Sequence, residues 1–322
     1  MSELHKFMFD GLPVRGSLVR LTDAWQELLA RRGASTAYAL PVQQLLGEMA
    51  AAAVLMQSGI KFDGALVLQI AGDGPVTLAV VEVQSDLGLR AMASVTGTVD
   101  ASASLSQMVN CQGRGRCAIT LDAQSRQPGQ PPYQGIVPLQ DGQHCYEQVS
   151  EVLQHYMRQS EQLDTTLVLA ANAELAAGLM LQRLPLGGAA NLARHAQVSD
   201  DDDALARLDY QRIALLASSL KAQELLELDA HTVLHRLFWQ EDLRLLDHDG
   251  KRPHFSCRCS RQRVEKMLLG LGWDEVHSVL QERGQVEVGC EFCGQQYQFD
   301  VVDAAALFKP ADLRPQADAG MH

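Results

Sequence analysis

The longest apolar stretch of the chain lies between residues 41 and 56, where Leu, Met, Val and Ala occupy most positions. Pro41 suits the first turn of a helix, because the amide hydrogen that proline lacks would have no partner there. A helix that is apolar nearly all round belongs in a core, so we expect this one to lie buried under a sheet. Before it, the pattern predicts a strand at 17–21 and a helix capped by Thr22.

Short apolar segments separated by turns follow this helix. The predicted strands are 66–70, 76–83, 90–95, 117–121, 133–139, 165–170 and 179–184. Strands joined by short turns favour an antiparallel meander over repeated parallel units. Between 133–139 and 165–170, apolar residues from Tyr146 to Tyr156 have the spacing of an amphipathic helix. The pattern over residues 1–185 therefore predicts an α+β fold, that is, a domain with an antiparallel sheet and helices.

Composition changes after Pro185. The next residues are poorly suited to a hydrophobic core, because they include Gly187, Gly188 and four aspartates at 200–203. They predict a domain boundary. The aspartates favour a solvated helix start over a binding patch, because acidic side chains stabilise a helix N-terminus. Apolar residues at helical spacing from Leu205 to Trp239 predict an amphipathic helical linker over residues 186–248. Such a segment needs packing partners to stay folded.

The last predicted unit spans residues 249–310. Ser260 and Gly270 bound one predicted helix, Asp274 and Gly284 bound a second, and 285–288 with 296–299 alternate as the arms of a hairpin. Residues 311–322 predict a disordered tail.

Two pairs of cysteines lie in this last unit, Cys257 with Cys259 and Cys290 with Cys293. Each pair can present two sulfur atoms to one ion, and two pairs complete a tetrahedral all-thiolate zinc site. Because the protein supplies all four ligands, no position stays open for water or substrate. The pattern therefore predicts a structural or sensing zinc rather than a catalytic one. The two sulfurs of Cys-x-Cys are also close enough for a disulfide, although such a small ring is strained.

Composition limits the classes of partner. The chain of 322 residues is 47% hydrophobic, yet no segment reaches the roughly 20 apolar residues of a membrane span. The net charge of −12 disfavours nucleic acid, because phosphate binding needs clustered Lys and Arg. Over residues 251–300, seven basic and seven acidic residues cancel. The N-terminus shows no signal sequence, so we expect a cytoplasmic protein, in which thiols stay reduced.

Three further cysteines, Cys111, Cys117 and Cys145, have spacings that fit no metal motif, and we interpret them as buried or idle thiols. His144 beside Cys145 does not make a catalytic dyad, since no other acid or base converges on it. No nucleotide-binding glycine motif is present. Spacing alone leaves two interpretations of the four-cysteine site open, an inert zinc ribbon and a redox switch.

Several motifs together resemble the redox-regulated 33 kDa heat-shock protein family of bacterial holdase chaperones, over nearly the whole chain. The shared segments are the two cysteine pairs at this distance, Pro-Val-Arg-Gly at 13–16, Lys-Phe-Asp-Gly at 61–64, Gly-Asp-Gly-Pro at 72–75, Tyr-Gln-Gly-Ile-Val-Pro-Leu at 133–139 and Ser-Glu-Gln-Leu at 160–163. The chain departs from the family pattern mainly in its three extra cysteines, which leave room for additional oxidation chemistry.

The resemblance implies a mechanism. Reduced Cys257, Cys259, Cys290 and Cys293 hold one zinc ion, and metal binding folds the C-terminal unit. Oxidation forms Cys257–Cys259 and Cys290–Cys293 disulfides, releases the zinc and unfolds the unit. The helical linker then exposes apolar surface that captures unfolding proteins without ATP. The resemblance also implies a homodimer when oxidised, a monomer when reduced, and no enzymatic activity.

Two alternatives from other classes remain at this point. A thiol-disulfide oxidoreductase would use Cys290 and Cys293 catalytically, although such a pair normally begins a helix in a βαβ setting. A constitutive protein-binding protein with a purely structural zinc ribbon would bind its partners equally in both redox states.

Overall fold

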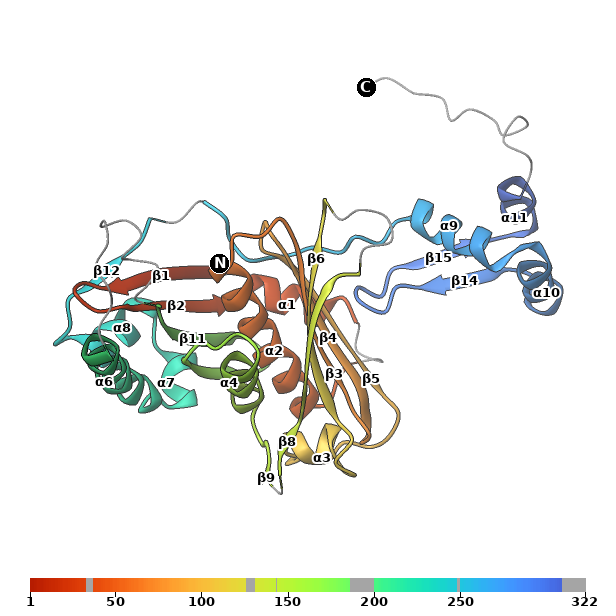
Figure 1. Cartoon of the computed structure of the whole chain (residues 1–322). Coiled ribbons are helices and arrows are strands. Elements are labelled where there is room, and N and C mark those ends of the chain that lie inside the picture. Colours follow the sequence, from red (N-terminus) through yellow and green to blue (C-terminus); the bar gives the residue numbers. More distant parts are fainter. Residues whose placement is uncertain (33–36, 126–130, 143, 186–199, 248–249, 309–322) are drawn as a thin grey trace. The chain divides into compact units, whose positions relative to one another are not determined.

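The computed structural model describes all residues except 33–36, 126–130, 143, 186–199, 248–249 and 309–322 (Figure 1). Its contacts divide the chain into two compact units, Met1–Ser256 and Cys257–His322. Helices and mostly antiparallel sheets make up the first unit, as the α+β prediction requires. The finer division at residues 185, 248 and 310 remains a proposal, and the predicted tail lies outside the described residues.

A six-stranded sheet contains the five strands predicted between residues 66 and 139. Its order is β13-β5-β4-β3-β6-β7, with β3 Gly64–Ala71, β4 Val76–Gln84, β5 Gly88–Val95, β6 Arg116–Ala123, β7 Tyr133–Pro138 and β13 His254–Phe255. The predicted meander holds for β3 to β5 and again for β6 with β7, but it is interrupted between β5 and β6. The long connection through α3 (Leu105–Val109) lets β6 return to the other edge of β3. Strand β13, which the sequence pattern did not predict, pairs with β5 in parallel.

A second sheet of five strands uses the two ends of the first unit. Its order is β10-β11-β2-β1-β12, with β1 Glu3–Phe9, β2 Val14–Leu21, β10 Thr165–Ala171, β11 Ala176–Arg183 and β12 Leu243–Leu245. Strands β2, β10 and β11 match the predictions, whereas β1 and β12 were missed. The two missed strands pair with each other, and β12 is too short to show an alternating pattern.

Helix α2 (Leu40–Gly59) packs against strands of both sheets, so it is buried between two layers rather than under one (Figure 1). Apolar side chains of both sheets and of α2 form one continuous cluster. The alanines at 50–53 and Gly47 allow the sheets to approach the helix closely. A Cβ atom on Gly47 would lie 2.4 Å from the Cβ of Ala171, which only glycine avoids.

Smaller elements complete the first unit. Helix α1 (Asp23–Ala30) lies against β13 and β5, α4 (Val149–Gln159) lies against β10, and β8 (Gln140–Asp141) pairs with β9 (His144–Cys145). Helix α1 begins after Thr22 as predicted, but the Thr22 side chain makes no capping bond. The hydroxyl of Ser2 takes that role, accepting hydrogen bonds from the amides of Thr22 (3.1 Å) and Ala24 (3.2 Å).

The predicted helical linker forms α6 (Asp200–Ser218), α7 (Ala222–Glu227) and α8 (Ala230–Phe238). These helices cover the face of the five-stranded sheet that points away from α2 (Figure 1). We call this contact the outer cluster. Its centre is three aromatic rings, with Phe238 lying 5.0 Å from Phe9 and 6.1 Å from Phe7 between ring centroids.

Polar contacts also hold these helices to the sheet. The Arg20 guanidinium on β2 donates to the carbonyl oxygens of Leu225 (2.7 Å), Leu226 (3.3 Å) and Leu228 (2.5 Å), where α7 ends. Carbonyls at a helix C-terminus lack partners within the helix, so a cation from β2 stabilises that end. Asp203, in the acidic run, pairs with Arg183 of β11 at 2.7 Å. The run is thus a helix start, as predicted, and one of its carboxylates anchors α6.

One half-buried acid makes the stability of this unit depend on pH. Burial raises the pKa of Glu48, on α2, from 4.5 to about 7. The folded state therefore keeps a proton that the unfolded chain loses, and stability falls as pH rises from about 4.5 to about 7. We expect Glu48→Gln to be more stable than the unchanged chain by up to about 3 kcal/mol at pH 8 and by less than about 1 kcal/mol at pH 5.

Urea unfolding at pH 5 and pH 8 measures this difference. Glu174→Gln, at an exposed position, is the control and should give the same small change at both pH values. Equal effects of Glu48→Gln at the two pH values would contradict the prediction.

The second unit contains α9 (Arg261–Leu271), α10 (Trp273–Arg283), the β14 (Val286–Gly289) and β15 (Gln296–Phe299) hairpin, and α11 (Val301–Leu307). Ser260 caps α9 and Gly284 ends α10, both as predicted. The predicted break was wrong, because α9 runs through Gly270 and Gly272 separates the helices instead of Asp274. Gly272 has a φ of +90°, which favours glycine and explains the break.

The hydrophobic core of the second unit is small. Seven buried apolar side chains form it: Val264, Leu268, Val276, Leu280, Val286, Phe299 and Ala304. Domains of this size bury little apolar surface and usually need a further constraint, such as a metal or disulfides.

Candidate metal centre

The four cysteines of the second unit come from two loops of different kinds. Cys257 and Cys259 lie in the extended segment before α9, and Cys290 and Cys293 lie in the turn between β14 and β15. Formation of the hairpin and capping of α9 by Ser260 place the two loops together. Three of the cysteines are half-buried and Cys293 is buried.

All four sulfur atoms lie within 4.8 Å of one another. The Sγ atoms of Cys257 and Cys290 are 3.7 Å apart, and those of Cys259 and Cys293 are 3.4 Å apart. In a tetrahedral zinc site with Zn–S bonds of about 2.3 Å, sulfur atoms are about 3.8 Å apart. The donor set therefore fits a metal ion of that kind. It is the one such cluster of His, Cys, Asp or Glu among the residues that the structure describes.

Backbone amides of the hairpin turn surround the sulfur atoms of Cys290 and Cys293. The amides of Phe292 and Cys293 donate toward the Cys290 sulfur, and that of Gln295 toward the Cys293 sulfur. The turn closes with a 2.8 Å bond from the Gly294 amide to the Cys290 carbonyl. Gly294 has a φ of +70°, so the predicted role of glycine in bringing these amides close has a backbone reason. Amide donors stabilise thiolate charge.

The four thiols do not ionise independently. Burial opposes ionisation of Cys257, but bonds from the Cys259 amide and from neighbouring thiols lower its pKa to about 7. Burial, followed by its thiol neighbours, raises the pKa of Cys293. Burial also raises the pKa of Cys290. Several thiolates this close repel one another, which is the repulsion that a bound cation offsets.

One further residue of the centre was not predicted. The Tyr297 hydroxyl donates to the Cys259 sulfur at 3.1 Å, from β15 to the segment before α9. This bond raises the pKa of Tyr297 to about 12. A tyrosine four positions after Cys293 carries no metal-binding signal of its own, so only the folded hairpin reveals it.

We expect Tyr297→Phe to weaken zinc binding by about 10- to 100-fold, as removal of a group that bonds a metal ligand typically does. Competition with a chromogenic chelator measures this affinity. Tyr133→Phe, at a tyrosine of the first unit, is the control. Unchanged affinity in Tyr297→Phe would show that the bond does not support the ligand.

The remaining cysteines lie in the first unit. Cys117 is buried on β6, and burial raises the pKa of its thiol to about 12, so it is the idle thiol that the sequence predicted. Cys145 is half-buried, whereas Cys111 is exposed. Of the two predicted alternatives, buried or idle, Cys111 is thus not buried, because its short loop after α3 faces solvent, and an idle thiol stays a prediction there.

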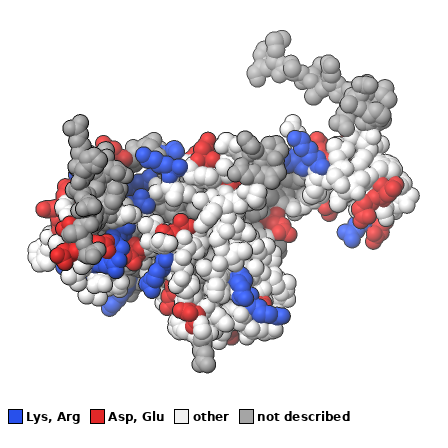
Figure 2. All heavy atoms as spheres, viewed as in Figure 1, with Lys and Arg blue, Asp and Glu red and all other residues white. Residues whose placement is uncertain are grey.

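The surface and the helices bear on the expected partners. On the face shown in Figure 2, basic and acidic side chains are interspersed among the described residues instead of gathering into one basic patch. No helix among the described residues is long and apolar enough to span a membrane.

Comparisons with known proteins agree with this fold. The profile of the family described as Hsp33 protein matches residues 2–300. A 33 kDa chaperonin of Chromobacterium violaceum is 44% identical over 306 residues, covering 95% of this chain and 93% of the relative. A 33 kDa chaperonin of Methylobacillus flagellatus is 40% identical over 316 residues, covering 98% and 97%.

A solved structure supports the fold. The 33 kDa chaperonin (heat shock protein 33 homolog) of Thermotoga maritima superposes with a TM-score of 0.71 at 21% identity, covering 94% of this chain and 97% of the other. The match over residues 2–300 and the high identity to whole-length relatives show that this chain belongs to the Hsp33 family.

Proposed function

We propose that this protein is a redox-regulated, ATP-independent holdase chaperone, inactive when reduced and zinc-bound and active when oxidised. The observation that carries the proposal is the convergence of four thiols in a unit with a small core. A unit of this kind depends on its metal, and thiol ligands make that metal sensitive to oxidants.

In the reduced state, Cys257 and Cys259 would bind zinc from the segment before α9, and Cys290 and Cys293 would bind it from the hairpin. When bound, zinc would hold these sulfurs as thiolates and tie the two loops together. The amides of the hairpin turn and the Tyr297 hydroxyl would orient the thiolates. The C-x-x-C pair lies in a hairpin turn rather than at a helix start, which counts against an oxidoreductase.

Oxidation would remove these ligands. Each pair of thiolates would lose two electrons to hydrogen peroxide, which takes up two protons from solvent and leaves as two water molecules while the zinc ion is released. We propose Cys257–Cys259 and Cys290–Cys293 as the pairs. The sulfur–sulfur distances of 3.7 Å (Cys257 to Cys290) and 3.4 Å (Cys259 to Cys293) connect cysteines of different loops, unlike the proposed pairs. Peptide mapping of the oxidised chain tests the pairing.

Loss of the second unit would then loosen the helices α6 to α8. The chain between α8 and Cys257 is tied to the first unit by β12 and β13, which pair over three and two residues. Strands this short depend on the chain beyond them staying ordered. Release of the helices would uncover the outer cluster of the five-stranded sheet, a continuous apolar surface suited to unfolding proteins.

The remaining features of the proposal follow the family resemblance. The partners are unfolding proteins, and oxidised chains form a homodimer whereas reduced chains are monomers. The protein works in the cytoplasm without enzymatic activity, on clients rather than on nucleic acid or membranes. The division into a domain of residues 1–185, a linker of 186–248, a zinc unit of 249–310 and a tail of 311–322 is part of this proposal.

Light scattering of a thermally unfolding client tests the function. The reduced zinc-loaded chain should leave aggregation unchanged, and the peroxide-treated chain should suppress it as zinc is released. Equal suppression in both states with zinc retained would favour a constitutive binding protein with a structural ribbon. Reduction of insulin disulfides by the chain would favour the oxidoreductase.

A further inference from the structure

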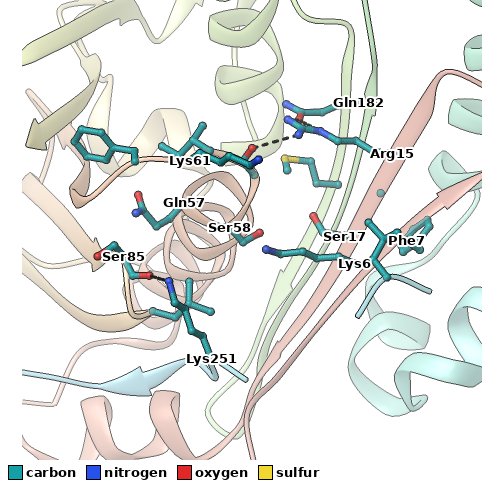
Figure 3. Close-up of a pocket in the computed structure, with 17 residues that line it drawn as sticks. Lys6, Phe7, Arg15, Ser17, Gln57, Ser58, Lys61, Ser85, Gln182 and Lys251 are labelled. Carbon is teal, nitrogen blue, oxygen red and sulfur yellow. Dashed lines mark hydrogen bonds between the residues drawn. The ribbon is translucent and has the colours of Figure 1, made fainter. Parts of the chain in front are cut away.

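A second site candidate lies in the first unit and contains none of the cysteines. A cavity of about 410 Å³ opens between the middle of β1, the start of β2, the end of α2 and the segment after β12 (Figure 3). Four basic side chains line it, from Lys6, Arg15, Lys61 and Lys251, and no Asp or Glu among the described residues does. Cavities of roughly 300–1,000 Å³ suit small ligands. In a chain of net charge −12, such a cavity is a local positive field.

The register of the five-stranded sheet explains why two of these cations meet. Side chains alternate along a strand, and Phe7 and Leu18 point into the outer cluster. Lys6, Arg15 and Ser17 therefore point to the opposite face, toward α2. Lys6 is the cross-strand partner of Ser17, and Arg15 is the partner of Gln182. This face thus presents a row of polar side chains at the end of α2.

Within the described part of the chain, Arg15 has only neutral partners. Its guanidinium donates to the Gln182 side-chain oxygen at 2.7 and 3.1 Å and to the Gly59 carbonyl at 3.2 Å. Burial lowers its pKa, which reflects the cost of a charge without a counter-ion. Among the residues that the structure describes, no carboxylate pairs with Arg15, Lys6 or Lys61. A partly buried arginine without a counter-ion favours an anion from outside the chain.

An independent observation comes from Gln57. This side chain is only 3% exposed, and its Oε1 atom is buried without a hydrogen-bond partner among the described residues. Gln57 lines the cavity together with Ser58, both at the end of α2 (Figure 3). An unsatisfied buried amide costs free energy unless a ligand or water bonds it. Its carbonyl oxygen needs a hydroxyl or another donor.

We propose that this cavity binds a small phosphate ester that carries a free hydroxyl group. The phosphate would lie among Lys6, Arg15 and Lys61, and the hydroxyl would donate to Gln57. Lys251, which donates to the Ser85 carbonyl at 2.9 Å, places the segment after β12 at the opposite wall. The segments 13–16 and 61–64, singled out in the sequence, both contribute to the site, although the redox chemistry uses neither.

Isothermal titration calorimetry of the reduced, zinc-loaded full chain tests this site at low ionic strength, with ribose 5-phosphate as the probe. We expect saturable binding of one molecule per chain that weakens as salt is added. Inorganic phosphate should bind more weakly, because it cannot reach Gln57 and the cations together. Ribose should not bind.

Variants separate the two parts of the site. Lys6→Gln and Lys61→Gln should each weaken ribose 5-phosphate binding by about 10-fold, as loss of a charge-assisted hydrogen bond does. Lys266→Gln, at an exposed position of the second unit, changes the net charge equally and should have no effect. Gln57→Leu should reduce the affinity for ribose 5-phosphate to that for phosphate.

Three results would overturn the proposal: no saturable binding of ribose 5-phosphate, equal weakening by Lys266→Gln, or equal affinity for phosphate and ribose 5-phosphate. None of these measurements depends on chaperone activity, so the cavity and the redox switch can fail separately.

Discussion

Replacing Cys290 with serine is expected to abolish tight zinc binding and to leave the second unit unfolded even under reducing conditions. Cys290 supplies one of the four sulfurs, and its sulfur lies 3.7 Å from that of Cys257. A serine hydroxyl stays protonated near pH 7 and is a poor zinc ligand. Because seven buried apolar side chains form the core of this unit, it lacks the burial to fold without its metal.

We expect zinc affinity to fall by more than about 100-fold, beyond the loss typical of residues that only bond a ligand. Equilibrium dialysis against a chelator measures the affinity, and limited proteolysis under reducing conditions reports on folding. Cleavage should begin in residues 257–308 and extend into α6 to α8.

Cys111→Ser is the matched control, since it makes the same change at an exposed cysteine outside the centre. It should leave zinc content and protease resistance unchanged. A Cys290→Ser chain that keeps one tightly bound zinc and full protease resistance would refute the coupling between metal and fold.

Replacing Phe238 with alanine is expected to activate the chaperone without oxidant. Phe238 is 2% exposed and holds α8 in the outer cluster through the rings of Phe7 and Phe9. Removal of a buried phenylalanine typically costs about 3–5 kcal/mol. Helices α6 to α8 pack on the sheet through this contact. The lost free energy should therefore weaken their packing on the sheet and leave the core around α2 unchanged. The cysteines are untouched, and zinc should stay bound.

Hydrogen exchange shows which helices the Phe238→Ala substitution destabilises. Amides of α6 to α8 should exchange faster in Phe238→Ala, while those of α2 stay protected. Reduced, zinc-loaded Phe238→Ala should also suppress client aggregation. Trp239→Ala is a close control, because the neighbouring side chain is 66% exposed and its loss should change neither property. Faster exchange without client binding would show that release of these helices does not switch the activity.

The metal centre could be predicted from the sequence, because each half of it is local. Cys257 and Cys259, like Cys290 and Cys293, are brought together by a single short loop, so their spacing along the chain carries the geometry. Helix α2 was predictable for a similar reason, since its composition alone requires burial on every side. Tyr297 was not, because its bond to Cys259 crosses from one loop to the facing strand.

The sheet order was the weaker prediction. Local patterns identified β3 to β7, but the return of β6 to the far edge of β3 depends on pairing between strands that a long connection separates. The short strands β12 and β13 have too few residues for a periodic signal, and only their partners β1 and β5 define them. The break between α9 and α10 followed the positive φ of Gly272 and not the capping preference of Asp274.

The sequence by itself therefore determined the class of fold, the buried central helix, the helical segment before the cysteines and the four cysteines whose sulfur atoms cluster. Each of these rests on interactions among residues near one another along the chain. Only the tertiary structure decided that α2 is enclosed by two sheets, that Phe238 closes the outer cluster, and that Lys6, Arg15, Lys61 and Lys251 share one cavity. Those features join segments far apart in sequence, and their geometry depends on strand register and packing, which no local pattern encodes.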